Sequence, residues 1–183
     1  MSDLHRELLD LLREKSVRYG EFTLASGKTS DFYVDARQTT LHARGAAVVA
    51  ELILERLGAG VDGVGGLTMG ADPVASSVAA LSGVHGRTVH GFLIRKEPKG
   101  YGVGAYVVGL GNLPEGSKVC IVEDTTTTGG SLIKAVERAR EAGLEVVQTL
   151  TVVDREEGAA ERLAAEGLTL EALATRTQLE AGG

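Results

Sequence analysis

Cysteine is almost absent from this chain, since Cys120 is the only one in 183 residues. No intramolecular disulfide can therefore form, and the apolar neighbours of Cys120 predict a buried thiol in a reducing environment. Long apolar runs are also absent, because no stretch approaches the ~20 residues that a membrane span requires. Residues 1–6 lack the apolar core of a signal peptide. We therefore expect a cytoplasmic protein that is neither exported nor embedded in a membrane.

Positive charge is in deficit as well, with a formal net charge of -6. Because nucleic-acid binding generally needs a basic face, this balance argues against a nucleic-acid partner. The four histidines do not lie at metal-ligand spacing from one another or from Cys120, so no structural zinc site is expected. The Gly-x-Ser-x-Gly pattern of a nucleophile elbow does not occur, which leaves hydrolase chemistry without support.

The length suits one domain with a real core, and we expect a single domain over residues 1–183. Helical and strand periodicities alternate along most of the chain. Helices are expected over 4–17, 41–57, 73–81, 132–142 and 159–165, and strands over 22–27, 32–34, 61–67, 89–94, 105–110, 119–122 and 145–153. The fold class is therefore α/β, a mainly parallel sheet with helices on both faces. Residues 168–183 contain nothing diagnostic.

Ligands of such sheets bind beyond the carboxyl ends of the strands, and segment 119–131 has the most informative residues at such an end. An apolar strand there ends in Glu123 and Asp124, which can bind adjacent ribose hydroxyls. Backbone N–H groups and hydroxyls of the following turn can surround a phosphate, which its glycines allow to approach closely. An ordinary capped helix is the alternative, but it explains only one such residue. The turn consists of Thr125, Thr126, Thr127, Thr128, Gly129, Gly130 and Ser131.

Segment 95–104 follows another strand and combines three cations, Arg95, Lys96 and Lys99, with three glycines. Glycines permit a loop to move, and cations can neutralise a leaving group such as pyrophosphate while loop closure excludes water. The alternative is a solvated surface hairpin, which is the usual role of exposed charged loops. Segment 65–73 is a strand end followed by a small-residue turn into a helix, and it can equally be an ordinary strand-to-helix turn with Pro73 at an early helical position.

Segment 119–131 resembles the phosphoribosyl pyrophosphate signature of the type I phosphoribosyltransferases. Segment 95–104 resembles the mobile catalytic loop of the orotate phosphoribosyltransferases, and 65–73 resembles their pyrophosphate loop. Residues 22–35 are similar to the family's hood segment, and 151–158 to the strand end whose arginine pairs with orotate. The resemblance extends from Tyr19 to Glu157. The chain departs from the family pattern at three places. Ala25 stands where many relatives have a lysine, and Tyr101 where the family often has a histidine. The lysine that some orotate enzymes carry near Met69 is also absent.

This resemblance implies an N-terminal hood formed mainly by residues 1–40 on a type I phosphoribosyltransferase fold. It implies transfer of ribose 5-phosphate from phosphoribosyl pyrophosphate to N1 of orotate, with Mg²⁺ held through substrate oxygens and waters rather than by a protein metal site. The implied catalytic residues are Asp124, Glu123, Lys96 and Lys99. Further substrate contacts are implied for Thr68, Met69, Gly70, Ala71, Arg95, Tyr101, Arg155, Phe32, Tyr33 and the turn from Thr125 to Ser131. A homodimer with shared active sites is also implied.

Other readings remain open at this point. The aromatic residues of the hood can be simple core residues, which is the usual role of isolated Phe and Tyr. Arg155 can belong to a surface charge cluster that starts a helix. A purine phosphoribosyltransferase would share the segment at Glu123 to Ser131 but would not need Arg155. A non-catalytic regulator that senses phosphoribosyl pyrophosphate is the alternative from another class, although such a protein usually needs a nucleic-acid surface.

Overall fold

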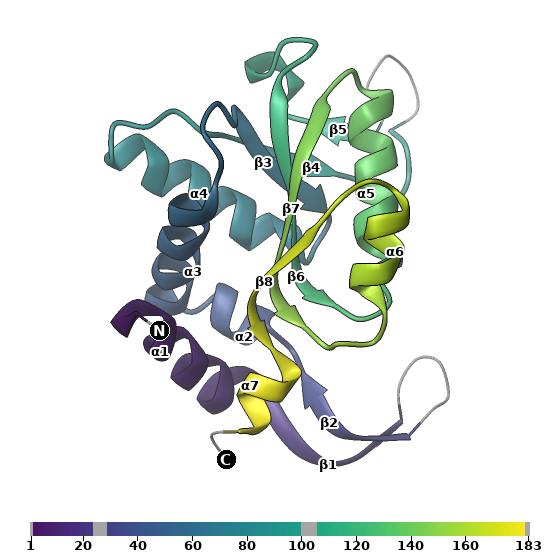
Figure 1. Ribbon diagram of the computed structural model, residues 1–183. Helices are drawn as coiled ribbons and strands as arrows, with labels where there is room; N and C mark the ends of the chain where they lie inside the picture. The colour runs from purple at the N-terminus through teal and green to yellow at the C-terminus, as the bar shows by residue number, and fades with distance from the viewer. Residues whose placement is uncertain (1, 24–28, 100–105, 182–183) are drawn as a thin grey trace.

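The computed structural model describes residues 2–23, 29–99 and 106–181. Its centre is a six-stranded sheet in the order β5-β4-β3-β6-β7-β8, in which only the β4 and β5 pair is antiparallel (Figure 1). The strands of this sheet are β3 Gly63–Leu67, β4 His90–Ile94, β5 Val107–Val108, β6 Lys118–Thr126, β7 Glu145–Asp154 and β8 Leu170–Thr175. The α-helices are α1 Asp3–Leu11, α2 Arg37–Thr40, α3 Ala43–Arg56, α4 Ala71–Val84, α5 Gly130–Glu141, α6 Ala159–Ala165 and α7 Arg176–Glu180.

Helices cover both faces of the sheet because its central strands are apolar on both sides. In β6, Cys120 and Val122 pack into a core shared with α1, α3 and α4. The alternating residues Val119 and Ile121 pack into a second core shared with α5 and α6. Figure 1 shows α3 and α4 on one side of the sheet and α5 and α6 on the other. The parallel strands therefore bring their carboxyl ends to one common edge.

A separate two-stranded antiparallel sheet forms the hood, which consists of β1 Val17–Thr23 and β2 Thr29–Val34. In Figure 1 the hood lies at the bottom, below the carboxyl edge of the large sheet. The last helix holds the hood segment in place, because Arg13 donates to the carbonyl oxygens of Leu179 at 3.2 Å and Gln178 at 2.7 Å. Arg176 also forms an ion pair with Asp31 at 3.2 Å.

The expected α/β fold, the parallel order and the hairpin of the hood are confirmed, with three differences in the elements. The first helix gives way to a π-helical turn at Leu12–Ser16, and Val17 already belongs to β1. The strand expected over 105–110 is reduced to Val107–Val108 within the described part. β6 continues to Thr126, so the two acids lie inside the strand rather than beyond it.

The structure also contains elements that the sequence did not predict, namely α2, β8 and α7. β8 pairs in parallel with β7, and α7 begins with a capping box between Thr175 and Gln178. These short elements lack a clear apolar period and depend on their neighbours for stability. Among the described residues, no helix is long and apolar enough to cross a membrane.

Candidate active site

A polar cleft follows the carboxyl edge of the sheet and has two connected parts. The larger part, with a volume of about 550 Å³, is lined by residues 125–132 together with Lys96, Glu97 and Lys134. The smaller part has a volume of about 300 Å³ and is lined by residues 33–35, 67–70 and Arg37. It is also lined by Glu123 and Asp124, which we call the acid pair. Lys96, Glu123 and Thr125 line both parts, so one continuous site runs from the turn before α5 to the hood.

The turn before α5 forms the wall of the larger part. Gly129 has a φ of 77° and leads directly into α5, which has no side-chain cap. The first N–H groups of this helix are therefore available to an anion, and the helix dipole favours a negative charge there. Thr126 differs from its neighbours, because its buried hydroxyl donates to Thr151 at 2.9 Å within the sheet.

The acid pair lies at the junction of the two parts. Glu123 is buried, with 7% of its surface exposed, and Asp124 accepts a hydrogen bond from the Thr125 N–H at 2.8 Å. Burial, together with the adjacent Asp124 carboxylate, raises the pKa of Glu123 to about 9. Burial therefore favours the protonated form of Glu123, and a bound cationic group would favour its ionised form.

The turn at 68–71 lies directly against the acid pair. A Cβ atom on Gly70 would lie 2.3 Å from Asp124 Oδ1 and 2.5 Å from Glu123 Oε1, so a side chain at this position would have to displace the two carboxyl groups. The Thr68–Met69 peptide bond is cis, and the Thr68 N–H donates to the Ile94 carbonyl oxygen at 2.8 Å. The Met69 side chain is 68% exposed. This turn therefore presents backbone groups, rather than a charged side chain, to the smaller part of the cleft.

The cation-rich segment after β4 is only partly in the cleft. Lys96 lines both parts, whereas Arg95 and Lys99 line neither. Arg95 is connected through its backbone, since its N–H donates to the carbonyl oxygen of Tyr106 at 2.8 Å. The Tyr106 ring lies under the Arg138 guanidinium at 3.8 Å, which anchors the returning end of this loop to α5. Tyr101 lies outside the described residues.

The side of the site expected to bind the base shows two different environments. Tyr33 lines the smaller part and packs against Phe22 with a centroid distance of 5.4 Å. Phe32 is fully buried and forms an edge-on contact with Tyr19. Because side chains alternate along a strand, β2 can present only one of its two neighbouring aromatic residues to the cleft, and that residue is Tyr33. Phe32 belongs to the buried core that includes residues of α1 and α3 and does not line the cleft in this structure, so its expected contact with the base stays a prediction.

Arg155 is also buried, with 7% of its surface exposed, and does not line either part of the cleft. Its Nη2 lies 2.9 Å from the Glu157 carboxylate, and its backbone N–H donates to the Thr126 carbonyl oxygen at 2.9 Å. In the described part of the chain its Nε has no hydrogen-bond partner. The Arg155 guanidinium can therefore bind a carboxylate, but in this structure it binds the carboxylate of Glu157.

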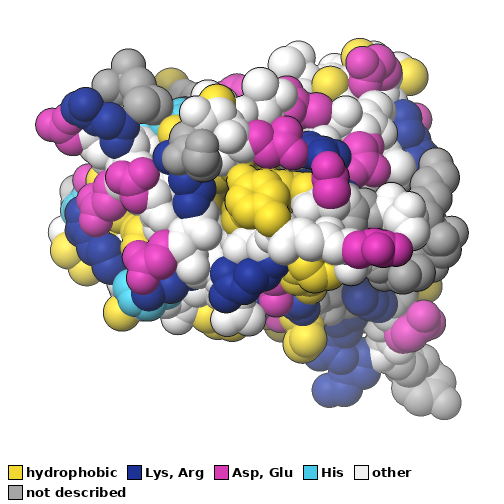
Figure 2. All heavy atoms as spheres, turned by 90° about the horizontal axis from the view of Figure 1, so that it is seen from below, with side chains coloured by type: hydrophobic (Ala, Val, Ile, Leu, Met, Phe, Trp, Pro, Cys, Tyr) yellow, Lys and Arg dark blue, Asp and Glu magenta, His cyan; other side chains and the backbone are white. Residues whose placement is uncertain are grey.

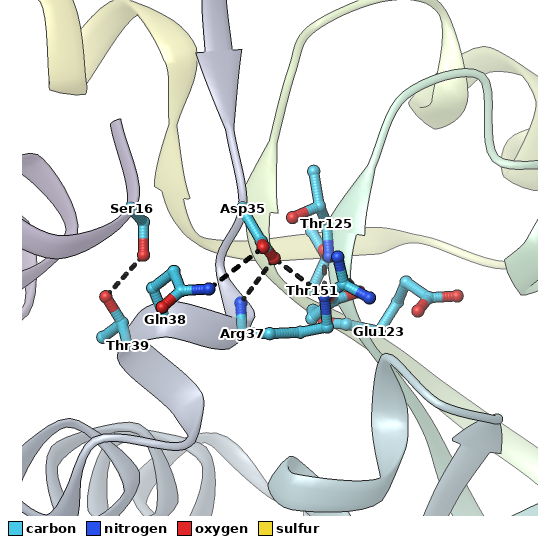
Figure 3. A network of polar contacts seen from close by, with 9 residues as sticks. Ser16, Asp35, Arg37, Gln38, Thr39, Glu123, Thr125 and Thr151 are labelled. Carbon is cyan, nitrogen blue, oxygen red and sulfur yellow. Dashed lines mark hydrogen bonds and ion pairs between the residues drawn. The ribbon is translucent and has the colours of Figure 1, made fainter. Parts of the chain in front are cut away.

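Four charged residues of the cleft were not among the predicted site residues, namely Glu97, Lys134, Asp35 and Arg37. Arg37 Nε lies 2.7 Å from Asp35 Oδ1 and 4.0 Å from Asp124 Oδ2. Figure 3 shows how Asp35 and Arg37 extend from the hood side towards Glu123 and Thr125. The Arg37 guanidinium lowers the pKa of Asp35 below its usual value. The only signal in the sequence was the pair of opposite charges just after the hood strand.

The parallel sheet, the acid pair and the uncapped helix after it define the site of a phosphoribosyltransferase, and a family model described as a phosphoribosyl transferase domain matches residues 38–174. Orotate phosphoribosyltransferases are similar over most of the chain. That of Rhodopseudomonas palustris is 50% identical over 91% of this chain and 90% of its own, and that of Nostoc is 43% identical over 98% and 87%. The chain belongs to the orotate phosphoribosyltransferase family.

The same relationship is visible in a solved structure. The orotate phosphoribosyltransferase of Mycobacterium tuberculosis in complex with 5-phospho-α-D-ribosyl 1-diphosphate superimposes with a TM-score of 0.78 and is 36% identical. The match covers 97% of this chain and 99% of that one.

Proposed function

We propose that this protein transfers ribose 5-phosphate from phosphoribosyl pyrophosphate to N1 of orotate, giving orotidine 5-monophosphate and pyrophosphate in pyrimidine nucleotide synthesis. The observation that carries the proposal is the position of the acid pair between two turns that present backbone groups. A substrate with a phosphate at one end, hydroxyls in the middle and pyrophosphate at the other end matches this order. The identity of the base is supported by the similarity to orotate phosphoribosyltransferases over nearly the whole chain.

In the proposed complex, the 5-phosphate occupies the larger part of the cleft, at Thr127 to Ser131. The ribose hydroxyls lie at Glu123 and Asp124, and pyrophosphate lies at the turn from Thr68 to Ala71, which contacts the acid pair through Gly70. Orotate lies on the hood side beside Tyr33, with its carboxylate on Arg155. For this contact Arg155 exchanges the Glu157 carboxylate for that of orotate, which suits its forked guanidinium.

The reaction breaks the bond between C1 of the ribose and the pyrophosphate oxygen, and the bonding electrons leave with pyrophosphate. Positive charge develops on the ribose ring, where the carboxylates of the acid pair stabilise it, while N1 of orotate forms the new bond and loses its proton to the departing pyrophosphate or to solvent. Arg95, Lys96 and Lys99 stabilise the leaving group when their loop closes. Of these three, only Lys96 lines the cleft in this structure, so closure must bring in the other two.

Mg²⁺ fits this site as an ion carried by the substrate. Among the described residues there is no cluster of three or more histidine, cysteine or acidic side chains that could hold a metal by itself. Glu123 and Asp124 nevertheless point their carboxylates at the pyrophosphate turn, and Mg²⁺ commonly binds through a few carboxylates, phosphate oxygens and waters. When bound, the ion neutralises part of the pyrophosphate charge.

Turnover of a panel of bases tests the proposal directly. We expect orotate to react with phosphoribosyl pyrophosphate and magnesium, with release of pyrophosphate, and adenine or hypoxanthine not to react. Turnover of a purine without turnover of orotate would establish the purine alternative. Binding of phosphoribosyl pyrophosphate without turnover of any base would establish the regulator.

We further propose a cytoplasmic homodimer, with no nucleic-acid partner, in which the loop after β4 completes the site of the partner subunit. A chain that lacks the loop cations, Arg95→Ala with Lys99→Ala, is mixed with an Asp124→Asn chain under conditions that allow subunit exchange. If sites are shared, one hybrid site receives both intact parts and activity returns, although each parent is inactive. No recovery in verified heterodimers would mean that each subunit completes its own site.

A further inference from the structure

Arg37 is a cation of the cleft to which no role has so far been assigned. It is the first residue of α2, directly after the hood, and it lines the smaller part together with the 67–70 turn and Lys96. Arg37 and Lys96 are the two cations among the residues that line this part. Any anion bound there is therefore neutralised from two sides, by α2 and by the segment after β4.

The position of the guanidinium is fixed from one edge only. Its Nε faces Asp35 Oδ1 at 2.7 Å and Asp124 Oδ2 at 4.0 Å, and the Arg37 backbone N–H also donates to Asp35 Oδ1 at 3.3 Å. Gln38 Nε2 donates to the other Asp35 oxygen at 3.3 Å, so both oxygens of this anchor are engaged. Within the described ranges, neither Nη nitrogen of Arg37 has a hydrogen-bond partner.

This arrangement suits a ligand with paired anionic oxygens. The two Nη groups of a guanidinium form a planar fork that matches two oxygens of a phosphate group. The side chain is 42% exposed, so an entering anion can reach the fork, whereas Asp35 is 18% exposed and holds the opposite edge. Across the cleft, the turn at Gly70 supplies backbone groups to the same volume.

We propose that Arg37 binds the pyrophosphate group directly and that Asp35 is the positioning residue that aims its guanidinium. This inference rests on the proposed function only for the name of the substrate, because it concerns an anion in the smaller part of the cleft. The competing explanation is structural, namely that Arg37 only neutralises Asp35 and Asp124 and connects the hood to β6.

Direct binding of magnesium pyrophosphate, measured by calorimetry, separates these explanations without requiring turnover. In Arg37→Gln we expect the Kd of pyrophosphate to rise by about tenfold to a hundredfold, which corresponds to the free energy of charge-assisted hydrogen bonds. The Kd of orotidine 5-monophosphate should stay within about threefold of wild type, since this ligand has ribose and 5-phosphate but no pyrophosphate. Arg37→Lys should recover part of the affinity through charge alone.

Two further variants exclude indirect effects. Arg44→Gln is the matched control, because Arg44 is an exposed arginine that pairs with Glu7 at 2.6 and 2.7 Å and does not line the cleft. The double variant Asp35→Asn with Arg37→Gln removes the carboxylate that Arg37→Gln leaves behind. We expect it to lose pyrophosphate affinity as Arg37→Gln does.

Recovery of pyrophosphate affinity in the double variant would overturn the proposal, because the loss would then come from repulsion by Asp35. An equal loss for pyrophosphate and orotidine 5-monophosphate would also overturn it, since that pattern indicates displaced Asp124. A weaker affinity for orotate alone would overturn the proposal and assign Arg37 to binding of the base instead. If the wild-type protein does not turn over orotate but Arg37→Gln still lowers the affinity for pyrophosphate, only the proposed function is contradicted.

Discussion

The two parts of the cleft are built in different ways. One continuous segment, residues 123–131, supplies most of the larger part, and the end of a strand and the start of a helix determine its shape. The smaller part is assembled from the hood, the turn at 67–70, the segment after β4 and the acid pair. The first part depends on backbone groups in local structure, whereas the second depends on charged side chains from distant segments. Seen from below in Figure 2, acidic and basic side chains lie close together around apolar ones on the hood side.

The strongest test of this comparison removes charge at the junction of the two parts. Asp124→Asn preserves the shape of the side chain but removes the charge that stabilises the ribose ring in the transition state. We expect kcat/KM to fall by about 10²–10³-fold, with the fold intact by circular dichroism. Asp3→Asn, at an exposed carboxylate on α1, is the control and should behave as wild type. Near-normal activity of Asp124→Asn would show that the junction does not act through charge.

The second prediction concerns the cost in folding stability of burying Glu123 at the same junction. An unfolded chain releases the Glu123 proton near its ordinary pKa of 4.5, whereas the folded protein retains it up to about 9. The wild type therefore loses stability as the pH rises between these two values. Glu123→Gln has no such loss, so we expect its free energy of unfolding to exceed that of wild type by up to about 3 kcal/mol at pH 7.

Denaturant unfolding without ligands, at pH 5 and pH 8, checks this expectation. The advantage of Glu123→Gln should be larger at pH 8, because wild type alone loses stability between the two values. An advantage that does not change with pH would mean that the Glu123 carboxyl is already ionised in the folded protein. Activity should fall in the same variant, as expected where a site is maintained at the expense of stability.

The third prediction concerns Lys99 and tests whether loop closure adds a cation to the smaller part of the cleft. Lys99→Ala removes a cation that is outside the cleft in this structure, so its effect should develop only when the loop closes. We expect kcat to fall by about tenfold to a hundredfold and the KM of phosphoribosyl pyrophosphate to change much less. Lys15→Ala is the control, since Lys15 pairs with Glu14 and lines neither part of the cleft. An unchanged kcat would contradict the role of this loop.

The smallest expected effect concerns the base. Glu157→Gln removes the negative charge that pairs with Arg155 at 2.9 Å, so orotate no longer competes with a charged neighbour. We expect the KM of orotate to fall by about threefold, in line with the modest strength of a partly exposed ion pair, and that of phosphoribosyl pyrophosphate to stay constant. Glu161→Gln on α6 is the control. A higher KM for orotate would show that Glu157 positions Arg155 for the substrate rather than competing with it.

The same contrast explains what the sequence could predict. The larger part is encoded locally, so the order of apolar strand, acids and turn residues was sufficient to predict its position. Arg37 could not be predicted in this way, because its place in the cleft depends on how α2 and the hood meet β6. Strand alternation could have indicated that Phe32 and Tyr33 face opposite sides, but it could not show which of them faces the cleft. β8 and α7 are short, and tertiary packing rather than propensity determines them.

The contacts of Arg13 with Gln178 and Leu179 have a consequence for synthesis of the protein. The hood segment leaves the ribosome early, whereas the helix that holds it is made more than 160 residues later. Figure 1 shows α7 beside the end of α1 that leads into the hood. Domains generally fold as units during synthesis. Because β8 directly precedes α7 in the chain, the edge strand of the sheet and the helix that anchors the hood become available together at the end of synthesis, so the ability to enclose the base is acquired last.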